Sequence, residues 1–307
     1  MVKKYLSLVK FSHTIFALPF AMIGLFLGII NNPDPRQTSL NKAISWRPDN
    51  ALSFIDWRFF LVKFLLVLLC MIFARSAAMA FNRWLDKNFD AKNPRTAIRE
   101  IPAGIISANH ALVFVLLNCL AFIITTWFIN VLCFYLSFVA LFVVLFYSYT
   151  KRFTPLCHLV LGLGLSLAPI GAYLAVTGVF TLLPLLFSFV VICWVSGFDI
   201  IYALQDVAFD KSQRLHSIPV WLGKKNALRF SEILHTIAIL LVTSAGMLGH
   251  FHWLYWIGTA IFAGMLFYQH SIVRPNDLSR VNIAFMTANG IASVTFAFFV
   301  ISDMLVY

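Results

Sequence analysis

Charge is scarce in this chain of 307 residues, and acidic side chains are scarcest of all. Only 11% of the residues are charged and twelve are Asp or Glu, whereas 61% are hydrophobic. Soluble domains carry roughly 25% charged residues. The composition therefore excludes an ordinary soluble protein and indicates a polytopic membrane protein.

Cysteine is also sparse, and no two cysteines form a C-x-x-C pair. Each lies singly within or beside an apolar run, which favours a small core residue over a disulfide or a metal ligand. The eight histidines form no H-E-x-x-H pattern either. The usual sequence evidence for a zinc site or a disulfide framework is therefore missing. The five cysteines are Cys70, Cys119, Cys133, Cys157 and Cys193.

Long apolar runs are abundant, and each is of roughly the length that a membrane-spanning helix needs. Only helices or closed barrels satisfy the backbone in lipid, and these runs lack the polar alternation of barrel strands. We therefore predict an all-α bundle of nine transmembrane helices. The first run is of spanning length and has no A-x-A-like cleavage site, so we do not expect a signal peptide. The runs are 14–31, 57–81, 111–128, 131–148, 158–177, 181–204, 231–249, 252–268 and 281–304.

A net charge of +11 could suggest nucleic acid as a partner, but the basic residues are divided among short loops. Membrane orientation explains this distribution better. Most of the 23 lysines and arginines, including Lys3, Lys4 and Lys10, fall on one side if the N-terminus is cytoplasmic. The sequence thus predicts an inner (plasma) membrane protein with a cytoplasmic N-terminus. The exceptions are Arg36, Lys42, Arg47, Arg58, Lys63 and, within the second run, Arg75.

The few acidic residues are concentrated in two segments at the predicted cytoplasmic ends of apolar runs. At about 100° per residue, Asn82, Asp86 and Asp90 share one helical face. A second stripe, on "DIIYALQDVAFD", consists of Asp199, Asp206 and Asp210. Carboxylates near lipid cost several kcal/mol unless they face a cavity, a partner or an ion.

Two facing acidic stripes would repel each other unless a cation lay between them. Hard oxygen ligands suit Mg²⁺, which bridges to substrate phosphates. The sequence therefore indicates a Mg²⁺ site flanked by basic residues that would bind the anion held by the metal. The alternative is that the stripes are solvated helix ends with ordinary i, i+4 charges.

Arg75 precedes Asn82 by seven residues and lies on the same helical face, deeper in the membrane. An intramembrane arginine indicates a functional site by default. We expect it to bind a diphosphate or a substrate carboxylate, unless its side chain merely reaches the membrane surface. Ser76, Ala77 and Ala78 beside it leave space for a cavity.

These segments resemble the UbiA-type intramembrane prenyltransferases, which attach isoprenoid chains to aromatic or other acceptors. The resemblance runs from the first predicted span to about the eighth, and it implies one membrane domain over residues 1–307. The ordered combination is far more specific than a lone N-x-x-x-D-x-x-x-D. The matching segments are "NRWLDKNFD", "RTAIREIPAG", "YSYTKRFT" and "DIIYALQDVAFD", with Ser217 and Gly223 further on.

The resemblance implies that two Mg²⁺ ions, bridged by the diphosphate, are held by Asn82, Asp86 and Asp90 on one side and by Asp206 and Asp210 on the other. It further implies a nine-helix architecture, with a central cavity open to the cytoplasm and an isoprenoid tail between the helices. We expect some of the 32 phenylalanines to supply an apolar groove for that tail and most of the others to face lipid or the core, so no individual phenylalanine is assigned to the groove. The residues expected to bind the substrate diphosphate are Lys87, Arg95, Arg99, Lys151 and Arg152.

Attack by a phenol needs a hydrogen-bond acceptor near the reacting carbon. Asp199 is our candidate to orient the hydroxyl, with Tyr202 nearby and Arg75 as a clamp; Asp199 could instead simply pair with Arg75. We expect no obligate protein partner and no nucleic acid.

Departures from the family pattern bear on the acceptor. Arg83 stands where many members have Asp, Glu100 where they have Pro, and His216 in place of their G-x-K-S segment. We predict transfer to 4-hydroxybenzoate in quinone biosynthesis, with a dihydroxynaphthoate of menaquinone biosynthesis as the alternative acceptor. From another class, a membrane cation transporter would also place acids in a helical bundle, but near the midplane.

Overall fold

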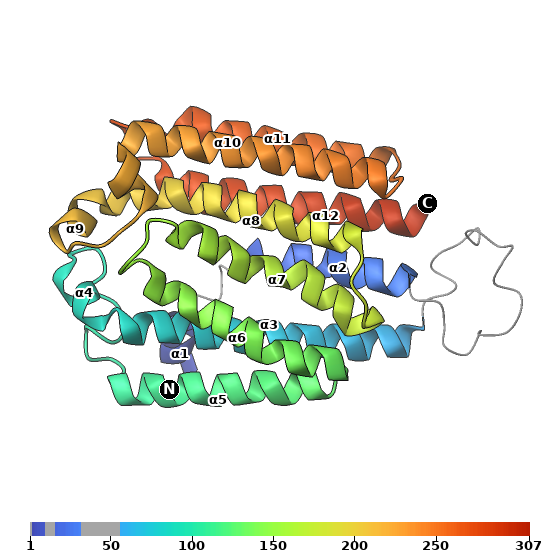
Figure 1. The fold of residues 1–307 in the computed structure, drawn as a ribbon, viewed down its shortest axis with the longest axis horizontal. Coiled ribbons are helices and arrows are strands. Elements are labelled where there is room, and N and C mark those ends of the chain that lie inside the picture. Colours follow the sequence, from blue (N-terminus) through green and yellow to red (C-terminus); the bar gives the residue numbers. More distant parts are fainter. Residues whose placement is uncertain (1, 10–15, 32–55) are drawn as a thin grey trace, which may run out of the picture.

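A computed structural model describes residues 2–9, 16–31 and 56–307. Within these residues the chain is all-helical, apart from one isolated bridge between Arg274 and Asp277. The long helices run along a common direction and form a bundle (Figure 1). The predicted all-α class is confirmed for the described part of the chain.

Each predicted apolar run coincides with a helix of 14 residues or more. The 3.6-residue geometry satisfies the backbone within each run, which is why long apolar segments become helices in lipid. The helices are α2 (Leu18–Asn31), α3 (Trp57–Leu85), α5 (Ala108–Trp127), α6 (Val131–Thr150), α7 (Cys157–Thr177), α8 (Leu182–Ala203), α10 (Ile218–Leu248), α11 (Trp253–Ile272) and α12 (Asn289–Val306), the last preceded by the π-helical η5 (Ile283–Ala288).

Seven helical segments of the described chain are long and apolar enough to cross a membrane, as expected for an integral membrane protein. Helix α2 is apolar but shorter, and α11 is not among the seven. The prediction of nine spans therefore goes beyond this count. The start of the first predicted span and the charges Lys10, Arg36, Lys42 and Arg47 lie outside the described residues.

Short helices follow the two long helices that carry the acidic stripes. Helix α4 (Lys87–Lys92) follows α3, and a 3-10 turn, η4 (Leu204–Asp206), links α8 to α9 (Val207–Ser212). Helices α4 and α9 lie at the same end of the bundle, which we call the α4–α9 end (Figure 1). Near the N-terminus, α1 (Val2–Val9) contacts this region through Ser7 Oγ, which donates to Glu100 Oε1.

Helix α7 packs tightly between α2 and α8. A Cβ atom on Gly24 of α2 would lie 2.0 Å from the Pro169 carbonyl oxygen, and one on Gly162 of α7 would lie 2.6 Å from the Ile192 carbonyl oxygen of α8. Small residues allow such close backbone approach in membrane bundles. This packing holds α7 in a fixed register against α8, which carries Asp199 and Tyr202 of the predicted site.

Candidate functional site

The first acidic stripe begins on the last turn of α3. Asn82 Nδ2 donates to Asp86 Oδ2 at 3.3 Å, and Asp86 is the residue at which α3 ends and α4 begins. Arg152, from the loop after α6, donates from Nη2 to Asp86 Oδ1 at 2.9 Å and to the Leu85 carbonyl at 3.0 Å. The predicted diphosphate ligand Arg152 therefore lies against the first stripe.

Asp90, the third member of that stripe, is buried on α4. Arg99 Nη1 donates to its Oδ1 at 2.7 Å, while Thr96 Oγ1 donates to its backbone carbonyl at 3.1 Å. Both partners come from the "RTAIR" segment, which folds back over α4. Asp90 Oδ2 is buried and makes no hydrogen bond within the described residues.

The second acidic stripe is bound by basic residues from other segments. Arg95 donates from Nε to Asp206 Oδ1 at 3.1 Å, and its Nη2 makes a second, shorter bond to Asp206 Oδ2. Lys151 Nζ lies 2.7 Å from Oδ1 of Asp210, whose side chain is fully buried. The His216 amide donates to the Lys151 carbonyl at 2.8 Å, which ties the loop after α9 to the loop after α6.

The structure thus brings the two stripes together through their basic neighbours. Arg95 reaches from the segment after the first stripe to Asp206 of the second stripe. Lys151 and Arg152 are adjacent in sequence, and each binds a carboxylate of a different stripe. Four carboxylates are therefore matched by four basic side chains at the α4–α9 end.

Burial shapes the charges at this end of the bundle. It raises the pKa of the Asp86 carboxyl to about 6, and the nearby Arg152 guanidinium only partly opposes this effect. Burial also acts to lower the pKa of the Lys151 ammonium, but the facing Asp210 carboxylate outweighs it and the pKa is raised. A carboxylate held poorly solvated in this way gains from a divalent cation.

The donor chemistry fits Mg²⁺. Within the described ranges, no three His, Cys, Asp or Glu side chains gather closely enough to hold a metal by themselves. Mg²⁺ does not require such a cage, because it is commonly bound by one or two carboxylates together with substrate phosphates. The buried Oδ2 atoms of Asp90 and Asp210, which have no hydrogen-bond partner in the described structure, are suited to it.

Of the remaining predicted site residues, Tyr202 contacts the matched charges, whereas Lys87 and Asp199 have other partners. Tyr202 binds Arg95, whose Nη1 donates to the phenol oxygen at 2.9 Å. Lys87 lies apart from the matched charges, since its ammonium stacks over the Trp84 ring at 5.5 Å. Asp199 Oδ2 lies 2.6 Å from His158 Nδ1, so Asp199 on α8 pairs with a histidine of α7.

Our sequence reasoning missed His158, which lies buried at the start of α7. No motif marks His158, because the histidines of this chain form no H-E-x-x-H pattern. The available signal was its position inside an apolar run, where an ionisable side chain needs a partner.

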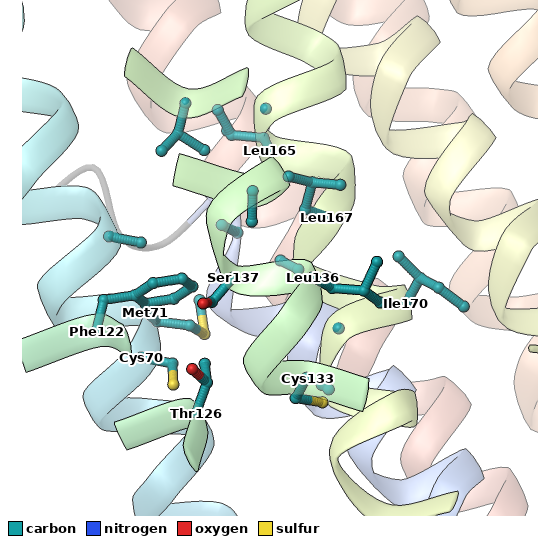
Figure 2. A pocket seen from close by; sticks show the side chains of 18 of the residues that line it. Cys70, Met71, Phe122, Thr126, Cys133, Leu136, Ser137, Leu165, Leu167 and Ile170 are labelled. Carbon is teal, nitrogen blue, oxygen red and sulfur yellow. The ribbon is translucent and has the colours of Figure 1, made fainter. Parts of the chain in front are cut away.

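A mostly apolar cavity of about 350 Å³ lies beside this charged region. Arg75 and Tyr147 line it towards the α4–α9 end, and Ile129 and Phe180 line its far part. Figure 2 shows side chains of α3, α5, α6 and α7 pointing into it. Phe122 and Phe180 are the phenylalanines of this lining, and most of the remaining lining residues are aliphatic.

Comparison with known proteins points to one family. A model described as the UbiA prenyltransferase family matches residues 51–291. The 4-hydroxybenzoate octaprenyltransferase of Tolumonas auensis is 30% identical over 223 residues, which cover 73% of this chain and 78% of that protein. The enzyme of the same name from a Marinomonas species is 31% identical over 224 residues, which cover 72% and 78%.

Solved structures share the fold. The apo structure of a UbiA homologue from Aeropyrum pernix K1 has a TM-score of 0.75 and 26% identity, covering 96% of this chain and 97% of that one. A UbiA homologue from Archaeoglobus fulgidus bound to GPP and Mg²⁺ has a TM-score of 0.71 and 18% identity, covering 98% and 99%. At the latter identity the likeness concerns the fold alone.

Proposed function

The chain belongs to the UbiA prenyltransferase family, and from that premise we propose that it transfers a polyprenyl chain from polyprenyl diphosphate to 4-hydroxybenzoate in quinone biosynthesis. Family membership makes it an enzyme, so the transporter alternative loses its support. The acceptor is proposed from the relatives named 4-hydroxybenzoate octaprenyltransferase.

One observation supports this function above the others: carboxylates and basic side chains from separate segments are matched one to one beside an apolar cavity. Asp86, Asp90, Asp206 and Asp210 each contact one of the predicted diphosphate ligands. A lipid diphosphate presents the same combination, with a multivalent anion at one end and a long apolar chain at the other. The arrangement is complementary to both ends.

Mg²⁺ would be held by Asn82, Asp86 and Asp90 on one side and by Asp206 and Asp210 on the other. When bound, it would stabilise the negative charge that develops on the leaving diphosphate. Arg95, Arg99, Lys151 and Arg152 would bind the diphosphate oxygens. Lys87 is proposed with them, although it would have to leave the Trp84 ring to do so.

The acceptor would lie where the charged region meets the cavity. Tyr147 lies within electrostatic range of Asp86, Asp199 and Arg75, and it lines the cavity with Arg75. Asp199 would accept a hydrogen bond from the acceptor hydroxyl, with Tyr202 nearby and Arg75 clamping the acceptor or the diphosphate. The aliphatic cavity would hold the isoprenoid chain away from water, which protects the developing allylic cation.

The wider arrangement is also proposed. Residues 1–307 would form one membrane domain of nine spans, with α2 and α11 added to the seven long apolar segments. The distribution of lysine and arginine favours an inner membrane protein whose N-terminus and site face the cytoplasm, with the site open on that side. No obligate protein partner or nucleic acid is required.

The test is to incubate purified protein with a labelled polyprenyl diphosphate and either 4-hydroxybenzoate or a dihydroxynaphthoate, with and without Mg²⁺, and to analyse products by mass. We expect prenylated 4-hydroxybenzoate only when Mg²⁺ is present. Product from the dihydroxynaphthoate alone would move the enzyme to menaquinone biosynthesis. No product from any aromatic acceptor would contradict the proposed function.

A further inference from the structure

The His158–Asp199 pair lies next to the proposed reaction centre but has no part in the metal and diphosphate contacts. His158 Nδ1 and Asp199 Oδ2 are 2.6 Å apart, and the His158 side chain is only 4% exposed, whereas that of Asp199 is 23% exposed. An ionised carboxylate can only accept hydrogen bonds. The ring nitrogen facing it must therefore carry the hydrogen, so His158 Nδ1 donates to Asp199 Oδ2.

The Asp199 side chain is partly exposed and lies near Tyr147, at the region where the acceptor would react. A donor with its diphosphate at the α4–α9 end and its chain in the cavity has its reactive carbon between them. Tyr147 marks this junction, since it lines the cavity and lies within electrostatic range of Asp199 and Asp86. Asp199 Oδ2 is engaged by His158, and Oδ1 makes no hydrogen bond in the described structure.

Resting on the proposed function, we propose that His158 is a positioning residue for prenyl transfer, which holds the Asp199 carboxylate so that its free oxygen accepts the proton of a phenolic acceptor. As the ring carbon bonds to the prenyl carbon, the bond from that carbon to the diphosphate breaks and its electron pair leaves with the diphosphate. The ring C–H proton then passes to the released diphosphate, and Asp199 returns the borrowed proton to the acceptor oxygen. Atoms and charge balance without a further reactant.

A purely structural role explains the pair less well. Helices α7 and α8 are already held by the close approach of Gly162 to the Ile192 carbonyl and by the bond from Ser196 Oγ to the His158 carbonyl at 3.1 Å. Buried charged pairs often add nothing to stability compared with apolar residues of similar size. The pair is therefore not needed to hold these helices together.

The choice of variants follows from which ring nitrogen is used. His158 Nδ1 makes the contact with Asp199, whereas Nε2 makes no hydrogen bond within the described residues. Asparagine can place a donor near the position of Nδ1, glutamine places one near Nε2, and leucine places none. His158→Asn, His158→Gln and His158→Leu therefore form a matched series.

The experiment measures kcat and both KM values for these variants with 4-hydroxybenzoate and with ring-fluorinated analogues, whose phenols are more acidic. We expect His158→Leu and His158→Gln to lower kcat on the order of 10- to 100-fold, with the KM of the polyprenyl diphosphate unchanged. The loss should shrink as the phenol becomes more acidic, because such an acceptor depends less on Asp199. His158→Asn should retain most of the activity.

Two outcomes would overturn the inference. One is wild-type kcat in His158→Leu. The other is a loss that is equal for all acceptors and equal in the Asn and Gln variants, which a structural defect would produce. If His158→Leu does not fold, the comparison of Asn with Gln decides in the same way. A wild-type protein that prenylates no aromatic acceptor would overturn the proposed function, and the inference with it.

Discussion

At the level of single residues, the basic partners of the four carboxylates have two roles: they pair with the carboxylates in this structure, and they would bind the diphosphate in the proposed reaction. Each carboxylate now contacts an arginine or lysine that the proposed reaction requires for the diphosphate. Loading the site with substrate would transfer these cations to the phosphate oxygens and leave the carboxylates to the metal. The carboxylates would then have a counter-charge both with and without bound substrate, so that no buried anion is left unpaired.

Removing single carboxylates tests this exchange. We expect Asp86→Asn and Asp206→Asn each to lower turnover at least about 100-fold, because charge stabilisation of the leaving group is lost. The melting midpoint in detergent should change little, since the side chains of Arg152 and Arg95 are 21% and 35% exposed and stay solvated. Turnover with the labelled donor and thermal melting check both statements.

Asp277→Asn is the matched control for these variants. Asp277 is an acidic residue in the loop after α11, where its carboxylate accepts hydrogen bonds from Ser279. It belongs to none of the four ion pairs at the α4–α9 end. It should keep wild-type turnover. Full activity in both Asp86→Asn and Asp206→Asn would remove the metal assignment.

Arg75 offers a second test at this scale. It lines the cavity next to Tyr147, so Arg75→Ala should raise the KM of the acceptor or of the donor about 10-fold or more, the range expected when a charged hydrogen bond is lost. Steady-state kinetics with each substrate varied in turn show which substrate it binds. Lys63→Met on the same helix is the control, because Lys63 Nζ binds the Ile129 carbonyl at the far end. Unchanged KM values in Arg75→Ala would leave Arg75 a structural role.

Residue identity could be predicted only where the chemistry repeats. The aspartates stand at regular helical spacing, so they could be identified from the sequence. The structure brings them together with Arg95, Arg99, Lys151 and Arg152. His158 stands alone in its run and is paired across helices with Asp199, forty-one positions away. No local spacing encodes such a contact.

At the level of elements, hydropathy locates helices better than it locates their ends. Helix α10 begins at Ile218, although the apolar run begins at 231, because a helix continues past the lipid wherever its backbone can still bond. Gly223 interrupts it with φ 75°, a conformation that glycine adopts without strain. The extended α10 packs against α8 and also contacts α9, the short helix that carries Asp210.

Two glycines of α7 give a prediction at this scale. Gly162→Ala should destabilise the protein by about 1–3 kcal/mol, because the new methyl would lie 2.6 Å from the rigid Ile192 carbonyl. Gly164→Ala should be neutral or slightly stabilising, since its nearest neighbour would be a Val144 methyl at 3.8 Å and alanine favours helix. Thermal melting of both in one detergent makes the comparison. Equal midpoints would contradict the tight α7–α8 contact.

At the level of the whole molecule, composition and run length predicted an all-helical membrane bundle because the bilayer leaves few alternatives. The placement of the cavity among α3, α5, α6 and α7 could not be predicted, because it depends on which helices pack closely and which stay apart (Figure 2). For the same reason, the sequence could not show which phenylalanines line the cavity. A Phe in lipid and a Phe in a cavity look alike in sequence.

The cavity gives the last prediction, which concerns the length of the donor. Gly171 lines it, and a Cβ there would meet nothing within 4 Å, so Gly171→Leu should place a side chain into the cavity without disturbing the helix packing. If the isoprenoid chain occupies this space, kcat/KM should fall at least about 10-fold for a long polyprenyl diphosphate, because displaced apolar contacts cost about 0.8 kcal/mol per CH₂. A donor of two isoprene units should be affected much less.

Gly264→Leu is the control for that experiment. Gly264 on α11 also has open space around its Cβ position but does not line the cavity. It should leave the dependence on donor length unchanged. If Gly171→Leu reduces activity equally for long and short donors, the chain does not run through this cavity, and its path must lie between other helices or in the lipid. A selective loss with the long donor would instead connect the dimensions of the bundle to the length of the chain it transfers.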